Sequence, residues 1–144
     1  MYRNTQFGTV IVGMVAAAIG FCLWIATENS WPPVTVAVLA VLIAILVLFW
    51  SLTVEVTLDT LRCSFGIGLI SKTIPMHQVK NAQHVRNHLF NGWGIRRVSG
   101  GWMFNVSGLD AVELTLDSGK KFRIGTNDPE GLLSAIETTI GSTA

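Results

Sequence analysis

The chain has 144 residues, half of them hydrophobic and only 13% charged, and its formal net charge is +1. An average soluble domain has about 25% charged residues, so the composition argues against an ordinary soluble protein. The near-neutral charge also argues against a nucleic-acid-binding protein, which needs a basic surface.

The charge deficit lies in two apolar runs near the N-terminus. Residues 7–26 read FGTVIVGMVAAAIGFCLWIA and residues 34–52 read VTVAVLAVLIAILVLFWSL, both without a charge. About 20 apolar residues in a helix cross a ~30 Å hydrocarbon core, so we predict two transmembrane helices. Two buried helices of a soluble protein are the alternative, but roughly 90 remaining residues could hardly enclose them. A cleaved signal peptide fits poorly, because the first run stays apolar through Ile25.

The link between the runs, TENSWPP at 27–33, has seven residues. A link this short forces an antiparallel hairpin, with both chain ends on one side of the membrane. The link carries Glu28 and no Lys or Arg, whereas Arg3 precedes the first run, and basic residues near span ends favour the cytoplasm. Trp24 and Trp31 suit the outer interface and Trp50 the inner one. We predict a multi-pass inner (plasma) membrane protein with cytoplasmic N- and C-termini.

Small residues recur along both runs at helical spacing: Gly13 and Ala17, Ala16 and Gly20, then Ala37, Ala40 and Ala44. Such spacing lets helix backbones approach closely in lipid. Packing of the hairpin against itself is one explanation, and a homodimer through these faces is the other.

The pattern changes to period two from Thr53 onward, which is typical of half-buried strands. We predict strands over about 54–58, 61–65, 69–74, 79–85, 101–106, 111–116 and 120–124, with a long loop at 86–100. Asp128 can cap a helix and Pro129 suits its first turn, so a helix is predicted over about 128–140. The chain then divides into a hairpin, residues 1–52, and a mainly-β domain, residues 53–144.

Seven short strands followed by one helix is the order of a pleckstrin-homology (PH) domain. The stretches LRCSFGIGLISKTIPM and GWGIRRVSGGWMFNVSGLDAVELTLDSGKKFRIGTNDPEGLLSAIE, with the preceding double span, resemble small bacterial membrane proteins that carry a PH-like domain behind a two-helix hairpin. The resemblance implies a partly open barrel or sandwich of about seven antiparallel strands with a C-terminal capping helix. It also implies a membrane-anchored binding or scaffolding role. The first hairpin, residues 58–62, has Arg62 as its one basic residue, so a phosphoinositide pocket of the eukaryotic type is not expected.

The direction of the strands predicts which turns face the bilayer. If each strand reverses the last, the turns at 66–68, 86–100 and 117–119 face the membrane, and those at 59–60, 75–78 and 107–110 face away. Basic residues near an anionic leaflet contribute about 1 kcal/mol each, and tryptophan suits the headgroup depth. The predicted lipid-contacting residues are therefore Arg86, Trp93, Arg96, Arg97, Lys120 and Lys121. A core position for Trp93 and a solvated Arg96–Arg97 pair are the alternatives.

No constellation of residues in the sequence points to catalysis or to a cofactor. His84 and His88 are four residues apart, but they fall on a strand that ends in a loop, which makes a metal site through them a minor alternative. We expect a non-enzymatic protein without cofactor or metal, whose domain binds a protein partner or anionic headgroups of the inner leaflet. The alternative is an accessory subunit of a larger membrane complex, recognised through its transmembrane helices.

Overall fold

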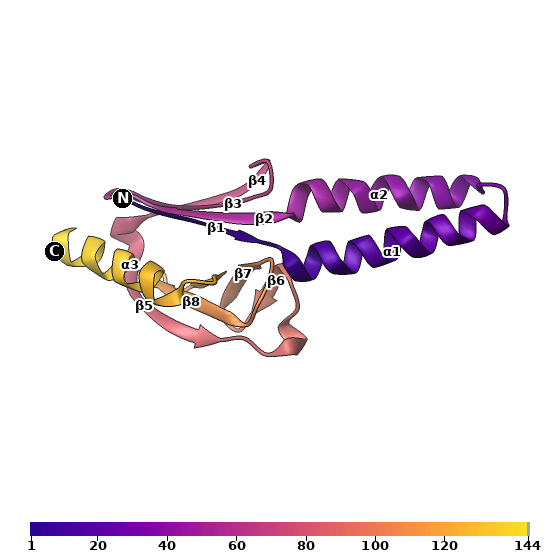
Figure 1. Ribbon diagram of the computed structural model, residues 1–144. Coiled ribbons are helices and arrows are strands. Elements are labelled where there is room, and N and C mark those ends of the chain that lie inside the picture. Colours follow the sequence, from indigo (N-terminus) through magenta and orange to yellow (C-terminus); the bar gives the residue numbers. More distant parts are fainter. Residues whose placement is uncertain (144) are drawn as a thin grey trace.

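A computed structural model describes residues 1–143 of the chain. Within these residues there are three α-helices and nine β-strands, and the strands form two sheets. A long helical hairpin projects from one end of the β-structure, while the N- and C-termini lie at the opposite end (Figure 1).

The hairpin consists of α1 (Thr9–Glu28) and α2 (Pro33–Phe49). Of the helices in residues 1–143, α1 with its 20 residues is the one long and apolar enough to cross a membrane, and α2 is shorter at 17 residues. The predicted spans, 7–26 and 34–52, extend too far toward the domain. Phe7 and Ser51 belong to strands instead, because their backbones pair with each other.

The first sheet contains β1 (Tyr2–Phe7), β2 (Ser51–Val56), β3 (Thr60–Phe65) and β4 (Ile70–Pro75), all antiparallel and in that order. Strand β1 was not predicted. Its register with β2 runs from Tyr2 opposite Val56 to Phe7 opposite Ser51. The division at residue 52 therefore leaves out a strand of the β-domain. The helical hairpin is an insertion between two adjacent strands.

The second sheet has the order β5-β8-β9-β7-β6. Its strands are β5 (Val79–Arg86), β6 (Gly94–Val98), β7 (Gly101–Asn105), β8 (Asp110–Leu116) and β9 (Lys121–Gly125), and short 3-10 helices η1 (Met76–Gln78) and η2 (Leu89–Asn91) flank β5. Strand β6 lies inside the predicted long loop. Strands β7 and β9 are parallel, so the expectation of a purely antiparallel domain is wrong at this pair.

The two sheets enclose one hydrophobic core. Phe65 of the first sheet contacts Phe104 of the second, with ring centroids 4.8 Å apart, and Phe104 in turn contacts Phe122. The C-terminal helix α3 (Pro129–Thr143) adds the fully buried Leu132 and Ile136. Its predicted start is confirmed, because the Asp128 carboxylate accepts a hydrogen bond from the Gly131 amide at 3.1 Å.

Candidate membrane-facing surface

The helices leave the sandwich at one end, which we call the helix-proximal end. Strand β1 enters α1 through Gly8, and α2 enters β2 through Trp50. The opposite, distal end holds Tyr2 and Val56, which pair at the far limit of β1 and β2 (Figure 1).

Three loops lie at the helix-proximal end. The turn after β3 packs on the last turn of α2, because the Gly66 amide bonds the Ser51 carbonyl at 2.8 Å and a Cβ on Gly66 would be 2.5 Å from the Val47 carbonyl oxygen. The turn after β7 meets the start of α1, where the Ser107 and Thr9 hydroxyls are 2.6 Å apart. The segment 87–93 lies beside that turn, since the Asn87 amide bonds the Leu109 carbonyl at 2.6 Å.

Two predicted turn positions are wrong. The turn at 107–110 was expected to face away from the helices, but it touches α1. The turn at 117–119 was expected to face the bilayer, but it is distal, because the Asp117 amide bonds the Gln78 carbonyl at 2.9 Å. The reason is β6. One additional strand inverts the direction of every strand after it, so Lys120 lies in a distal turn.

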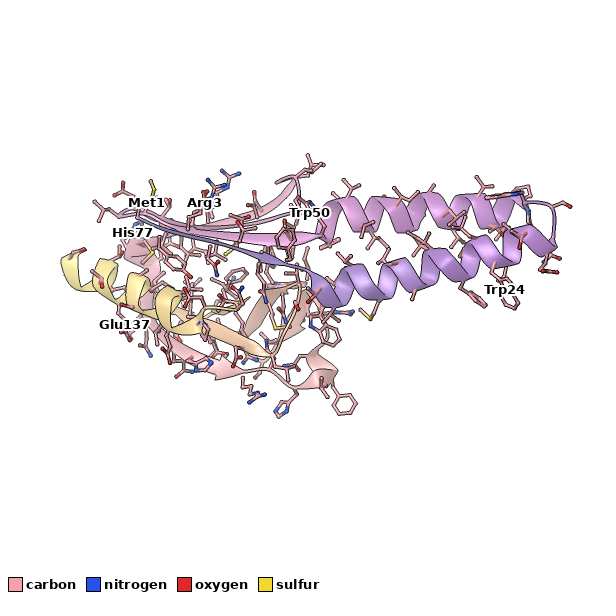
Figure 2. All side chains as sticks on the ribbon, viewed as in Figure 1. Met1, Arg3, Trp24, Trp50, His77 and Glu137 are labelled. Carbon is pink, nitrogen blue, oxygen red and sulfur yellow. The ribbon has the colours of Figure 1, made fainter. Side chains whose placement is uncertain are left out.

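Large apolar side chains are exposed around the helix-proximal end. Phe7 and Trp50 stand at the strand–helix junctions, with ring centroids 5.6 Å apart, and Figure 2 shows Trp50 at the base of the hairpin. We call this set the apolar rim; its members and their exposed fractions are Phe7 62%, Trp50 40%, Ile67 61%, Leu69 75%, Leu89 67% and Phe90 102%. Apolar patches of this kind mark protein or membrane contact sites.

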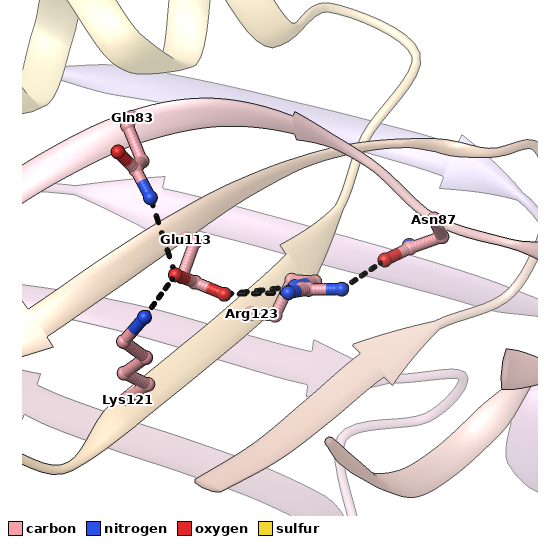
Figure 3. Close-up of polar contacts among 5 residues, drawn as sticks. All are labelled: Gln83, Asn87, Glu113, Lys121 and Arg123. Atoms are coloured by element: carbon pink, nitrogen blue, oxygen red, sulfur yellow. Dashed lines mark hydrogen bonds and ion pairs between the residues drawn. The ribbon is translucent and has the colours of Figure 1, made fainter. Parts of the chain in front are cut away.

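A partly buried polar network holds one part of the rim in place (Figure 3). The Arg123 guanidinium donates to the Asn87 side-chain oxygen at 2.8 Å and to the Glu113 carboxylate at 2.6 Å. Lys121 and Gln83 donate to the other Glu113 oxygen, at 3.0 and 3.3 Å. Since Asn87 begins the segment that carries Leu89 and Phe90, this network fastens the segment to the sheet.

The charge of Glu113 is maintained by its partners. Burial works to raise the pKa of Glu113, but the hydrogen bonds and positive charges of Arg123 and Lys121 outweigh it and lower the pKa below its usual value. Glu113 is therefore ionised and paired. Because Arg123 and Lys121 donate to the Glu113 carboxylate from the neighbouring strand β9, the arrangement is structural. Loss of these partners would leave the Glu113 charge uncompensated.

The other predicted contact residues are divided between this end and the rest of the domain. Arg86 is exposed at the end of β5, beside the rim segment. Trp93 packs partly buried against the core, and Arg96 donates to its carbonyl at 3.0 Å. Arg97 lies over the Trp102 ring, 5.8 Å from its centroid, and Lys121 pairs with Glu113. Leu89 and Phe90 fall within the predicted membrane-facing loop, 86–100, but nothing in the sequence indicated Asn87, Glu113 and Arg123 as a unit.

The two histidines considered for metal binding, His84 and His88, have different surroundings. His84 contacts Asp110 at 3.2 Å, and His88 is exposed just before η2. Among residues 1–143, no group of three or more His, Cys, Asp or Glu side chains lies close enough to share a metal ion.

Comparison with protein-family models, with curated proteins and with solved structures finds no match to this chain. The PH-like resemblance therefore stays an expectation based on strand order and sequence pattern.

Proposed function

We propose that this chain is a non-enzymatic integral membrane protein that seats a PH-like β-domain on the inner leaflet and presents it to a cytoplasmic protein partner. The observation that carries the proposal is the apolar rim. Its residues come from the two strand–helix junctions, from the turn after β3 and from the segment 87–93, and all of these lie at the helix-proximal end. Apolar side chains placed in this way bury their exposed surface in the interfacial region of the bilayer that the hairpin crosses.

Both helices cross the bilayer in this proposal. Helix α2 has 17 residues and a length of about 26 Å, which a modest local thinning of the bilayer accommodates. Trp24 and Trp50 lie toward opposite ends of the hairpin, at the depths that interfacial tryptophans favour (Figure 2). The link has no basic residue, whereas Arg3 and Arg86 are on the domain side, and this distribution favours cytoplasmic termini.

A charged residue beside the rim adds an electrostatic term. Arg86 is exposed next to Leu89 and Phe90. Each basic residue held near an anionic leaflet contributes about 1 kcal/mol. The rim and this charge together fix the tilt of the domain, so that its distal end points into the cytoplasm.

A labelling experiment tests whether the rim enters the bilayer. Phe90→Cys in the full chain, with Cys22→Ala, is labelled with an environment-sensitive fluorophore and reconstituted in nanodiscs with and without anionic lipid. The remaining Cys63 is fully buried and burial raises its thiol pKa, so it does not react. The matched control is Leu58→Cys, because Leu58 is also exposed, at 71%, but lies in a distal turn.

We expect a blue-shifted emission at position 90 and a water-like emission at position 58. Quenching by lipids labelled at the headgroup should affect only position 90. Equal, water-like emission at both positions would refute the seating of the domain on the bilayer.

The second candidate function is an accessory subunit recognised through its helices. A Cβ on Gly13 or on Gly20 would meet no atom within 4 Å, so these glycines do not serve the α1–α2 contact. The face they form is open to another helix, from a partner subunit or a second copy of this chain. Crosslinking in native membranes with Gly13→Ile and Gly20→Ile tests this candidate, which predicts loss of a specific crosslinked species.

A further inference from the structure

A second surface, on the flank of the sandwich, gathers positive charge. Lys72 of β4, Arg97 of β6 and Lys120 of the β8–β9 turn line one open groove of about 530 Å³. Val98, Gly100, Gly101 and Trp102 complete the lining of what we call the flank groove. Its size lies in the range of small-molecule sites, about 300–1,000 Å³.

The flank groove lies where the two sheets leave a seam. Strand β4 is an edge of the first sheet and β6 is an edge of the second, and within residues 1–143 no strand pairing joins the two sheets. Side chains from both sheets therefore meet across the seam without a backbone ladder between them. A ligand in the seam would contact both sheets at once.

The three cations have no acidic partner. Within residues 1–143 the ion pairs join Arg3 to Glu55, His84 to Asp110, and both Lys121 and Arg123 to Glu113. No acidic residue lines the flank groove. Three unpaired positive charges in one concave site attract an anion of more than one charge.

Arg97 is oriented before any ligand arrives. Its guanidinium lies 5.8 Å from the centroid of the Trp102 ring, a cation–π arrangement that restrains the side chain. Gly101 cannot carry a side chain there, because a Cβ would meet the Lys121 carbonyl oxygen at 1.6 Å. The close β7–β9 pairing at Gly101 fixes the backbone of the groove, and a restrained guanidinium can form the paired hydrogen bonds that phosphate oxygens accept.

We propose that the flank groove binds a phosphate group of dianionic character, a phosphomonoester or a pyrophosphate. Two sources carry this chemistry: a membrane lipid with a phosphomonoester headgroup, and a soluble phosphoester. Arg97 makes the paired contact, Lys72 and Lys120 neutralise the remaining charge, and Trp102 supports Arg97. This site is separate from the apolar rim and does not depend on it.

The experiment uses the full chain in phosphatidylcholine nanodiscs, with two arms. In the first, inorganic pyrophosphate is titrated and its binding is measured by calorimetry. In the second, the discs contain increasing phosphatidic acid, and binding of the headgroup is followed by its phosphorus NMR signal. Both arms compare wild type with Arg97→Gln, Lys72→Gln and Arg97→Lys. Arg62→Gln and Lys80→Gln remove exposed cations elsewhere and are the matched controls.

We expect saturable binding in at least one arm, weakened about tenfold or more by Arg97→Gln and by Lys72→Gln. Arg97→Lys should weaken it less than Arg97→Gln does, and the two control variants should leave it unchanged. The arm that responds identifies the source of the phosphate. The proposal is overturned if neither arm saturates, or if the control variants weaken binding as much as Arg97→Gln does. Unfolding curves of each variant show whether a loss comes from misfolding, and Arg97→Lys keeps the test decisive if Arg97→Gln does not fold.

Discussion

The backbone amide of Gly8 donates a hydrogen bond to the carbonyl oxygen of Trp50 at 2.8 Å, and this contact closes the junction between the hairpin and the sandwich. The chain passes through this junction twice, into α1 and out of α2, by way of two adjacent paired strands. A single flexible linker would let a domain rotate freely against its anchor. Two paired strands and a hydrogen bond between them hold the apolar rim in a fixed position relative to the helical hairpin.

The Gly8 position should tolerate no side chain. A Cβ there would lie 2.8 Å from the Phe49 carbonyl oxygen and 3.2 Å from that of Trp50. We expect Gly8→Ala to destabilise the folded chain by about 1–3 kcal/mol, because the junction has to open to admit the methyl group. Thermal unfolding of the full chain in detergent measures the effect. Gly13→Ala is the control, since a Cβ at Gly13 meets nothing within 4 Å; equal melting of the two variants would show that the junction is loose.

The β-domain should fold without its hairpin, provided that β1 is kept. Phe7 and Ser51 are paired directly, so a two-residue Asn-Gly turn can replace residues 8–50. We expect this shortened chain to be soluble and to unfold cooperatively. A fragment of residues 53–143 should not, because it lacks β1 and the bond from the Gln6 side chain to the Ser107 carbonyl. Dispersed NMR spectra and urea unfolding compare the two, and a fragment as stable as the shortened chain would mean that β1 is dispensable.

Glu113 should make stability depend on pH at the acidic side. Its pKa is lowered in the folded chain, so the unfolded chain takes up the proton more readily. The contribution of Glu113 to the free energy of unfolding is therefore complete above the ordinary carboxyl pKa, about 4.5. It is lost as the pH falls through the lowered pKa of the folded chain. We expect Glu113→Gln to lower the free energy of unfolding by about 1–3 kcal/mol at neutral pH and to flatten the acidic decline in stability. Urea unfolding across a range of pH measures both effects, and Glu137→Gln is the control because Glu137 is exposed. If stability falls with the same slope against pH in wild type, Glu113→Gln and Glu137→Gln, Glu113 does not cause the acidic decline.

Tyr2 should report on the docking of β1 against α3. Burial, followed by the hydrogen bond and the charge of Asp128, raises the pKa of Tyr2 to about 12. The pKa of Tyr2 is higher in the folded chain than in the unfolded chain. The contribution of Tyr2 to stability is therefore complete below the ordinary tyrosine pKa, about 10, and is lost as the pH rises toward 12. Tyr2 is the one tyrosine in the chain, so ultraviolet absorbance of tyrosinate follows it alone. We expect Asp128→Asn to lower the midpoint of the titration, whereas a wild-type midpoint near that of the unfolded chain would contradict the docking.

Local pattern was sufficient for much of the fold. Two uncharged apolar runs on either side of a short link predicted the helical hairpin, and period-two alternation predicted most strands. The Asp128-Pro129 start predicted α3. These features depend on residues that are close together in the sequence, where hydrophobic spacing and capping act directly.

Only the tertiary structure decided β1, β6, the parallel pair and the polar network. The polar residues of β1 have no reason to be extended until β2, on the far side of the hairpin, supplies their hydrogen-bond partners. Strand β6 is short and begins with a glycine, so its pattern is weak, and missing it reversed the predicted positions of the later turns. The two edges that form the flank groove, and the meeting of Asn87, Glu113 and Arg123, depend on which strands lie side by side. That order is set by packing around a shared core, which local spacing does not encode.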